Sequence, residues 1–220
     1  MPHIPVFQHA NGKWRPRWRG RLHGLAALVS IPAGVLLLVR AEGSAAHVAA
    51  ALYGAALLIM FSASAAYHHT PVRARWRPGM QRLDHCGIYV LIAGTYVPLC
   101  LLALPWRWGI PMLCVVGSSA VAGIVLKLAA YHRSTNIGHV LYLAMGWVVV
   151  VAGPVLVDRL STTQLVLFGL GGLFYTLGFP VLVTRWPNPW PRTFGYHEIW
   201  HGCTVAAAAL HFVGVASLIR

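Results

Sequence analysis

The chain has 220 residues, of which 58% are hydrophobic and only 10% are charged. Because water-soluble domains usually carry about 25% charged residues, this composition indicates a polytopic membrane protein and argues against a soluble enzyme. The net charge of +13 could suggest nucleic-acid binding, but the basic residues lie in short segments between apolar runs. There they act as topology signals and contacts with anionic lipids, so we expect membrane lipid and no nucleic acid as a partner.

Seven apolar stretches are long enough to cross a bilayer, which takes about 20 residues each in a helix. In chain order they cover approximately residues 22–39, 45–67, 84–104, 109–130, 137–157, 161–184 and 197–219. Lipid excludes open sheet edges, so the spans must be helices. The connections are short, and we therefore expect an all-α fold with one domain, residues 1–220: a seven-transmembrane helix bundle that follows a basic tail, residues 1–21.

The basic residues predict how this bundle is oriented. With the N-terminus in the cytoplasm, 13 of the 17 Lys and Arg fall on the inner side, which is the positive-inside pattern. The inner residues are Lys13, Arg15, Arg17, Arg19, Arg21, Arg73, Arg75, Arg77, Arg82, Lys127, Arg133, Arg185 and Arg192; the outer ones are Arg40, Arg107, Arg159 and Arg220. An odd number of spans then predicts that the C-terminus lies outside.

Residues inside the spans suggest local features. Pro98 and Pro180 predict kinks in the third and sixth spans. The stretch Gly94–Pro98 either serves packing or opens space for a cavity. All four cysteines lie in apolar runs without CxxC spacing, which indicates reduced thiols rather than disulfides; they are Cys86, Cys100, Cys114 and Cys203.

A metal site is predicted by histidines at the inner ends of two spans. His197 and His201 are four residues apart in the stretch HEIWH, so both project from one face of a helix. His68 ends the second span, and Ser64 lies one turn deeper on the same face. Asp84 opens the third span. The predicted topology brings all of these residues to the cytoplasmic side at similar depth, where ionisable groups in a membrane usually have a function.

Three neutral imidazoles with one open position are typical of catalytic zinc. We therefore predict Zn²⁺ bound by His68, His197 and His201. Asp84 would offset the metal's charge and could orient a water molecule or take its proton. Ser64 could hydrogen-bond an oxyanion or that water molecule.

Several of these residues allow a second interpretation. HEIWH also fits the metalloprotease pattern H-E-x-x-H with Glu198 as general base, although no third ligand follows, and Glu198 could instead favour the positive end of a helix. His69 lies about 100° around the helix from His68, and His85 could support the site beside Asp84. A single histidine is more often a hydrogen-bonded bundle residue than a ligand; this default covers His3, His9, His23, His47, His132, His139 and His211.

Three sequence blocks resemble the hemolysin III family, the bacterial branch of the progestin and adiponectin receptor superfamily. They are SAAYH from Ser64 to His68, RLDHCGIYVLIAGTYVPLCL from Arg82 to Leu101, and FGYHEIWHGCTVAAAALHF from Phe194 to Phe212. The resemblance implies a seven-helix bundle with a cytoplasmic N-terminus in the bacterial inner membrane.

The same resemblance implies site residues and an activity. The family's zinc histidines match His68, His197 and His201, its water-associated aspartate matches Asp84 and its serine matches Ser64. Related receptors and the alkaline ceramidases are linked to lipid-amide hydrolysis, whereas bacterial members were named for haemolytic activity and have been connected with membrane homeostasis. Val97 departs from the threonine that is common before the proline, without affecting the site.

Three functions follow as hypotheses. The first is a zinc-dependent hydrolase of lipid amide or ester bonds that acts in membrane lipid homeostasis. The second is a non-enzymatic membrane sensor or homeostasis regulator whose zinc is structural. The third is a cytolytic pore, which the sequence favours least because no span shows a polar stripe.

Overall fold

Helices form nearly all of the regular structure in the residues that the computed structural model describes, 16–69, 75–130 and 135–219. The α-helices are α1 (Arg21–Arg40), α2 (Gly43–His69), α3 (Arg77–Pro98), α4 (Trp106–Ala129), α5 (Thr135–Trp147), α6 (Gly153–Arg159), α7 (Thr162–Thr184) and α8 (Tyr196–Leu218). A π-helix, η1 (Leu99–Ala103), extends α3, and a 3₁₀-helix, η3 (Val148–Ala152), joins α5 to α6.

Seven helical segments in the described part of the chain are long and apolar enough to span a membrane, which confirms the predicted fold class. They are Arg21–Arg40, Gly43–His68, Arg77–Ala103, Trp106–Ala129, Ile137–Arg159, Thr162–Thr184 and Tyr196–Leu218. One predicted boundary was wrong: α3 begins at Arg77, about two turns before Asp84. Pro78 occupies the first turn, where its missing N–H costs nothing, so the helix can begin there. The residues between Pro78 and Asp84 are therefore part of α3.

Large apolar side chains cover the outer surface of the bundle. Leu28 of α1 is 67% exposed, Val39 79% and Val121 of α4 62%. In water such a surface would associate or aggregate, but in a bilayer it faces lipid tails. The protein is therefore an integral membrane protein.

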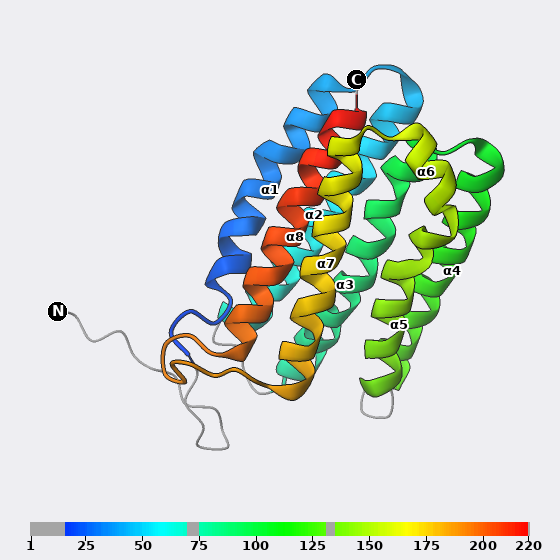
Figure 1. Ribbon diagram of the computed structural model, residues 1–220. Helices are drawn as coiled ribbons and strands as arrows, with labels where there is room; N and C mark the ends of the chain where they lie inside the picture. The colour runs from blue at the N-terminus through cyan, green and yellow to red at the C-terminus, as the bar shows by residue number, and fades with distance from the viewer. Residues whose placement is uncertain (1–15, 70–74, 131–134, 220) are drawn as a thin grey trace.

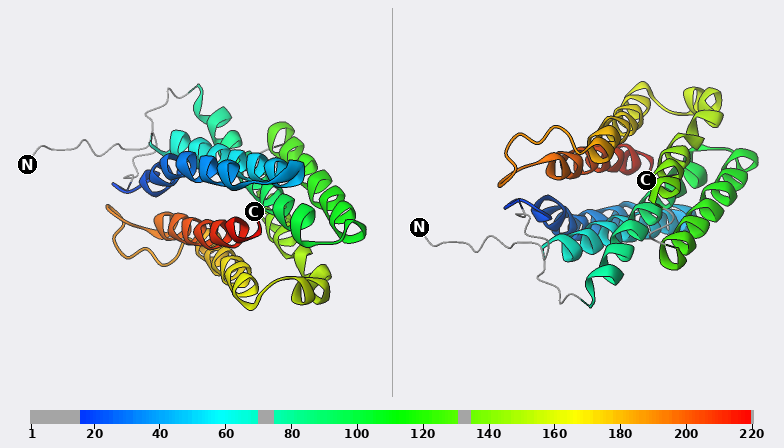
Figure 2. Two further views of the ribbon diagram at one scale, coloured as in Figure 1. Left: turned by 90° about the horizontal axis from the view of Figure 1, so that it is seen from above. Right: turned by 90° about the horizontal axis from the view of Figure 1, so that it is seen from below.

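The seven spans lie side by side, and each packs against the next until α8 returns to α1 (Figure 1); α5, η3 and α6 together form the fifth span. Views from above and below show α1 beside α2, α4 beside α5 and α7 beside α8 (Figure 2). The start of α1 and the end of α8 lie at opposite ends of the bundle (Figure 1), as an odd number of spans requires.

Which end faces the cytoplasm stays a prediction. Five of the basic residues that carry it lie outside the described residues: Lys13, Arg15, Arg73, Arg133 and Arg220. His3, His9 and His132 also lie outside them.

Helix α3 belongs to both hydrophobic cores. One core joins residues of α1, α2, α3 and α8, and the other joins α3, η1, α4, α5, η3 and α6. Tyr96 supports the second core where α5 gives way to the 3₁₀-helix: its hydroxyl donates to the carbonyl oxygen of Met145 at 2.7 Å and accepts from the backbone N–H of Val149 at 2.9 Å. These bonds satisfy backbone groups that the change of helix type releases, as a bilayer demands.

The stretch Gly94–Pro98 serves both of its predicted purposes. Gly94 faces Ala56 of α2 so closely that a Cβ at position 94 would overlap the Ala56 Cβ. The α-helical pattern ends at Pro98, and the span continues as the π-helix, so the third span departs from a regular α-helix next to its proline. An apolar hollow of ≈ 320 Å³ between α2, α3 and α4 is lined in part by Gly94 and Val97, and none of the predicted metal ligands lines it.

Candidate metal centre

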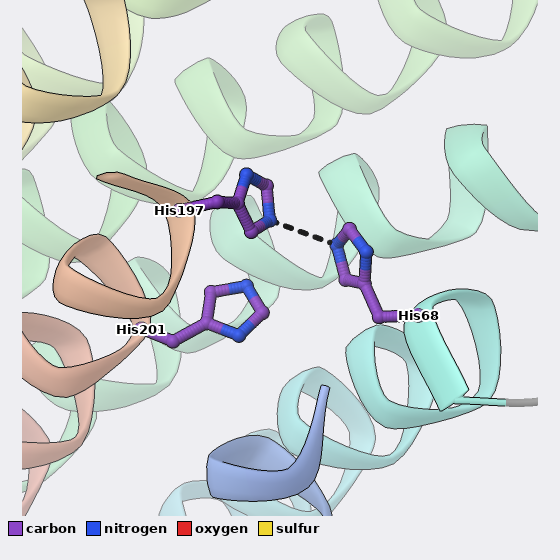
Figure 3. A group of neighbouring side chains, drawn as sticks. All are labelled: His68, His197 and His201. Atoms are coloured by element: carbon purple, nitrogen blue, oxygen red, sulfur yellow. Dashed lines mark hydrogen bonds between the residues drawn. The ribbon is translucent and has the colours of Figure 1, made fainter. Parts of the chain in front are cut away.

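Three histidine side chains from two helices point toward one another (Figure 3). His68 comes from the last turn of α2, and His197 and His201 come from the first two turns of α8. One nitrogen of each ring lies within 4.8 Å of the others, and Nε2 of His197 is 3.1 Å from Nε2 of His68. His68 and His201 are buried and His197 is half-buried. The structure thus brings together residues 129 positions apart in the chain.

The first turn of α8 is held by contacts that fix its two histidines. Oε2 of Glu198 accepts a hydrogen bond from the backbone N–H of Gly195 at 2.8 Å, and Oε1 contacts Nε of Arg19 at 2.5 Å. The segment before α1 is also paired with the α7–α8 loop, because the N–H groups of Arg17 and Trp18 donate to carbonyl oxygens of that loop. The start of α8 is therefore anchored to the start of α1.

These contacts argue against Glu198 as the general base of a metalloprotease. Its side chain is 1% exposed, and both carboxylate oxygens already have partners. A general base needs a free oxygen within reach of the proton that it abstracts. Glu198 instead caps the helix and pairs with a cation, in line with the alternative that it favours the positive end of α8.

Asp84 lies next to the histidine cluster. Its Oδ2 is 3.4 Å from Nε2 of His68, the same nitrogen that faces His197. The side chains of His68 and Asp84 are 7% and 13% exposed, so the carboxylate is largely shielded from solvent. The predicted proximity of Asp84 to the ligands is thus present in the structure, two turns inside α3 rather than at its start.

Ser64 has a different partner from the one expected. It is 2% exposed, and its Oγ lies 2.8 Å from Nδ1 of His23. His23 comes from the first turn of α1, and it also reaches Thr204 of α8, with 2.8 Å between Nε2 and Oγ1. The sequence placed His23 among the ordinary bundle histidines, and it is indeed hydrogen-bonded. Its position within the site was not predicted.

A signal for His23 was nevertheless present. It follows Arg21 at the predicted inner end of the first span. The predicted topology therefore puts His23 at a depth in the membrane similar to that of His68 and His197. The spacing rule that singled out His197 and His201 works only within one helix and could not reveal a residue contributed alone by α1.

The side chain of His69 lies outside the described part of the structure, and the four other histidines have other surroundings. His47 is exposed and its Nδ1 bonds to the carbonyl of Gly43. Nδ1 of His85 contacts the carbonyl of Gln81 at 2.7 Å. The ring of His139 packs against Phe179, and His211 contacts the carbonyl of Phe168 through Nε2. None of these four belongs to the cluster of nitrogens that can share a metal ion.

Comparison with known proteins shows the family to which the chain belongs. The sequence model of the family described as "Haemolysin-III related" matches residues 12–212, which contain every residue of the site. The chain belongs to this family.

Individual relatives agree with the assignment. The chain is 33% identical over 193 residues to the "Hemolysin-3 homolog" of Bacillus subtilis, which covers 86% of this chain and 87% of the relative. It is 31% identical over 196 residues to "Hemolysin-3" of Bacillus cereus, covering 86% and 85%. A more distant relative is the human "Monocyte to macrophage differentiation factor", 25% identical over 228 residues and covering 94% and 87%.

The donor set of this haemolysin-III relative fits a metal ion. Nitrogens that share a tetrahedral zinc at about 2.0–2.1 Å lie about 3.3 Å apart, and the His68 and His197 nitrogens are already 3.1 Å apart. A neutral imidazole offers one lone pair, and a nearby carboxylate can offset part of a divalent charge. The histidine cluster can therefore hold a metal ion in the membrane domain.

Proposed function

We propose that this chain is a zinc-dependent membrane hydrolase that cleaves lipid amide or ester bonds. The observation that carries the proposal is the convergence of three imidazoles and one carboxylate at one end of the bundle. His68, His197 and His201 would hold the ion, and three histidines are a donor set used by catalytic zinc, which keeps a fourth position for water or substrate. Borderline imidazole ligands favour zinc over magnesium or calcium, which prefer oxygen.

Bound zinc would polarise a carbonyl group and make a water molecule more acidic. The chain's own residues would manage the protons. Asp84, with Oδ2 beside the ligand cluster, can hold a proton at a carboxylate oxygen and pass it to the leaving group. The burial of His68 and His201 keeps bulk water from competing for the site.

Lipid is the substrate class that the surroundings favour. The site lies at one end of a bundle whose outer surface is apolar, and the positive-inside pattern would put this end at the inner leaflet. A lipid with its cleavable bond near the headgroup would reach such a depth with its chains still in the bilayer. We expect the protein to act in the inner membrane of a bacterium, in membrane lipid homeostasis.

The test combines metal analysis with lipid turnover. Purified protein in vesicles of bacterial lipid is compared with His197→Ala, and products are followed by untargeted lipid mass spectrometry. We expect bound zinc and hydrolysis products with the wild type and neither with the variant. His47→Ala, which changes an exposed histidine of α2, should behave as the wild type. Full turnover by metal-free wild-type protein would refute the proposal.

A non-enzymatic role with structural zinc is the second candidate. Its support is that the same ion would tie the end of α2 to the start of α8, helices that come from distant parts of the chain. In that case chelation lowers thermal stability, but no lipid pool yields a product with the zinc-loaded protein. The two roles therefore differ in turnover and not in metal content.

A further inference from the structure

His23 connects the three helices around the metal centre. From α1 it contacts Ser64 of α2 through Nδ1 and Thr204 of α8 through Nε2, both at 2.8 Å. Its ring also lies flat against that of His201, with centroids 3.7 Å apart and planes inclined by 9°. The residue is 3% exposed. Neither ring nitrogen is directed at the metal ligands, so His23 is not itself one of them.

The contacts of Thr204 determine where the proton of His23 lies. The Thr204 hydroxyl is 2.9 Å from the carbonyl oxygen of His201. A carbonyl oxygen can only accept, so the hydroxyl hydrogen is committed to that bond. Oγ1 of Thr204 must therefore accept from Nε2–H of His23. The tautomer of a histidine is fixed in this way by the partner of one nitrogen.

The same reasoning then fixes the hydrogen of Ser64. A neutral His23 with its proton on Nε2 has a lone pair on Nδ1, and that lone pair faces Oγ of Ser64 at 2.8 Å. Two lone pairs at this distance would repel, so the Ser64 hydroxyl donates to His23.

We propose that His23 is a positioning residue of the metal centre, which holds the ring of His201 by stacking and is itself held in place by donating from Nε2–H to Thr204 and accepting at Nδ1 from Ser64. This inference rests on metal binding at the proposed site. It reverses the role expected for Ser64, because a hydroxyl whose hydrogen is committed to His23 cannot also donate to an oxyanion.

Stacking gives His23 a second effect. His201 carries a ligand nitrogen, and its ring can turn about the bond to Cβ unless neighbours restrain it. The parallel ring of His23 restrains it from one side, while the hydrogen bonds to Ser64 and Thr204 restrain His23 in turn. Partners that orient metal ligands typically contribute about 10- to 100-fold in metal affinity.

Three variants separate these effects. His23→Phe keeps an aromatic ring beside His201 but loses both hydrogen bonds. In His23→Gln the side-chain oxygen can accept from Ser64 and the amide can donate to Thr204. Thr204→Val removes the acceptor for Nε2 and keeps the shape of the side chain. Matched controls are His47→Gln in α2 and Thr176→Val in α7, a threonine with a similar bond to its own helix.

The first readout is metal binding by the intact protein in detergent. Affinity is measured for zinc by competition with a chelator, and ligand geometry by the visible spectrum of the cobalt-substituted protein. We expect His23→Phe to bind about 10- to 100-fold more weakly with an altered cobalt spectrum, His23→Gln to recover part of both, and the controls to match the wild type. A folded His23→Phe protein with wild-type affinity and spectrum would overturn the inference.

The second readout needs neither metal nor turnover. Protein labelled with ¹⁵N in its histidine rings reports by NMR which nitrogen of His23 carries the proton, the signal being assigned by its loss in His23→Gln. We expect the proton on Nε2 in the wild type and a shift toward Nδ1 in Thr204→Val. A proton on Nδ1 in the wild type would overturn the inference even if His23→Phe fails to fold.

These readouts also separate this inference from the proposed function. If the wild type binds zinc but releases no lipid product, hydrolysis is refuted and the positioning role of His23 stands on affinity and tautomer. If hydrolysis is found and His23→Phe keeps its affinity and cobalt spectrum, the positioning role is refuted and hydrolysis stands.

Discussion

Arg19 and Glu198 form an ion pair with Nε and Oε1 2.5 Å apart, although 179 positions separate them in the chain. Their side chains are 15% and 1% exposed. The pair joins the segment before α1 to the turn of α8 that carries His197 and His201. It therefore neutralises a buried carboxylate and also holds together the two helices that contribute His23 and two of the candidate ligands.

Breaking this pair should destabilise the fold. Removing one partner of a buried ion pair leaves the other charge uncompensated and costs about 3–5 kcal/mol. We therefore expect Glu198→Ala to lower the free energy of unfolding by that amount, measured by denaturant or thermal unfolding in detergent. Glu42→Ala, at an exposed site, is the control and should change stability little. Equal stability of the two variants would contradict the prediction.

Removal of the metal should also reduce stability. A ligand that binds only the folded state stabilises it by about 2.7 kcal/mol at a free concentration one hundred times its Kd. We expect a chelator to lower the melting temperature of the wild type and to leave that of His68→Ala unchanged, because this variant lacks one of three ligands. Thermal unfolding with and without chelator measures both. His47→Ala should respond as the wild type does, and a wild type insensitive to chelator would count against a resident ion.

Asp84 is the residue whose replacement should separate chemistry from binding. Asp84→Asn removes the carboxylate that can hold a proton but leaves the three imidazoles in place. Proton transfer by a positioned side chain contributes about 10²–10⁴-fold to a rate. We expect turnover to fall by such a factor while the zinc content stays near that of the wild type.

The control for Asp84→Asn is Asp158→Asn, since Asp158 lies exposed on α6. It should retain full turnover. If Asp84→Asn hydrolyses lipid at the wild-type rate, the carboxylate has no role in proton transfer.

The spans could be predicted from sequence because the thickness of the bilayer sets the length of each apolar run, and the hydropathy of each residue can be read without knowing the fold. The start of α3 was missed for the same reason: the segment from Arg77 to Arg82 contains two arginines and a glutamine and is not an apolar run, but it is helical. The interruption of the fifth span by a 3₁₀-helix was also missed. It depends on Tyr96 of another helix, whose hydroxyl satisfies backbone groups near Met145 and Val149.

The candidate site was predictable where its residues share a helix or a depth. His197 and His201 follow from spacing, and His68 and Asp84 follow from their positions near span ends. The pairing of Ser64 with His23 and that of Glu198 with Arg19 depend on how helices rotate against each other. Helix rotation is set by packing throughout the bundle, and no local pattern in the chain encodes it.

The orientation of the bundle leads to a prediction about its ends. The basic residues place the N-terminus inside, and seven spans then bring the C-terminus outside. Alkaline phosphatase fused after Arg220 should be active in bacteria and a green fluorescent protein at the same position dark. Fusions after Arg185, in the loop between α7 and α8, should give the opposite pattern. The reverse result at both positions would mean that the metal centre faces outward.

Close packing of α3 against α2 should make Gly94 intolerant of a larger residue. A Cβ at this position would overlap the Cβ of Ala56, and both residues lie inside long helices, α3 and α2, that pack against each other. Overpacking of a well-packed interior costs about 1–3 kcal/mol, so Gly94→Ala should lower the free energy of unfolding by that amount.

Gly117→Ala in α4 is the matched control, because no atom lies within 4 Å of a Cβ there. Gly117 lines the apolar hollow between α2, α3 and α4. The added methyl group should leave the free energy of unfolding unchanged or raise it by up to about 1 kcal/mol, because alanine is more stable than glycine in a helix interior. Unfolding of both variants in the same detergent measures the difference, and equal stabilities would show that α2 and α3 separate without cost at this contact.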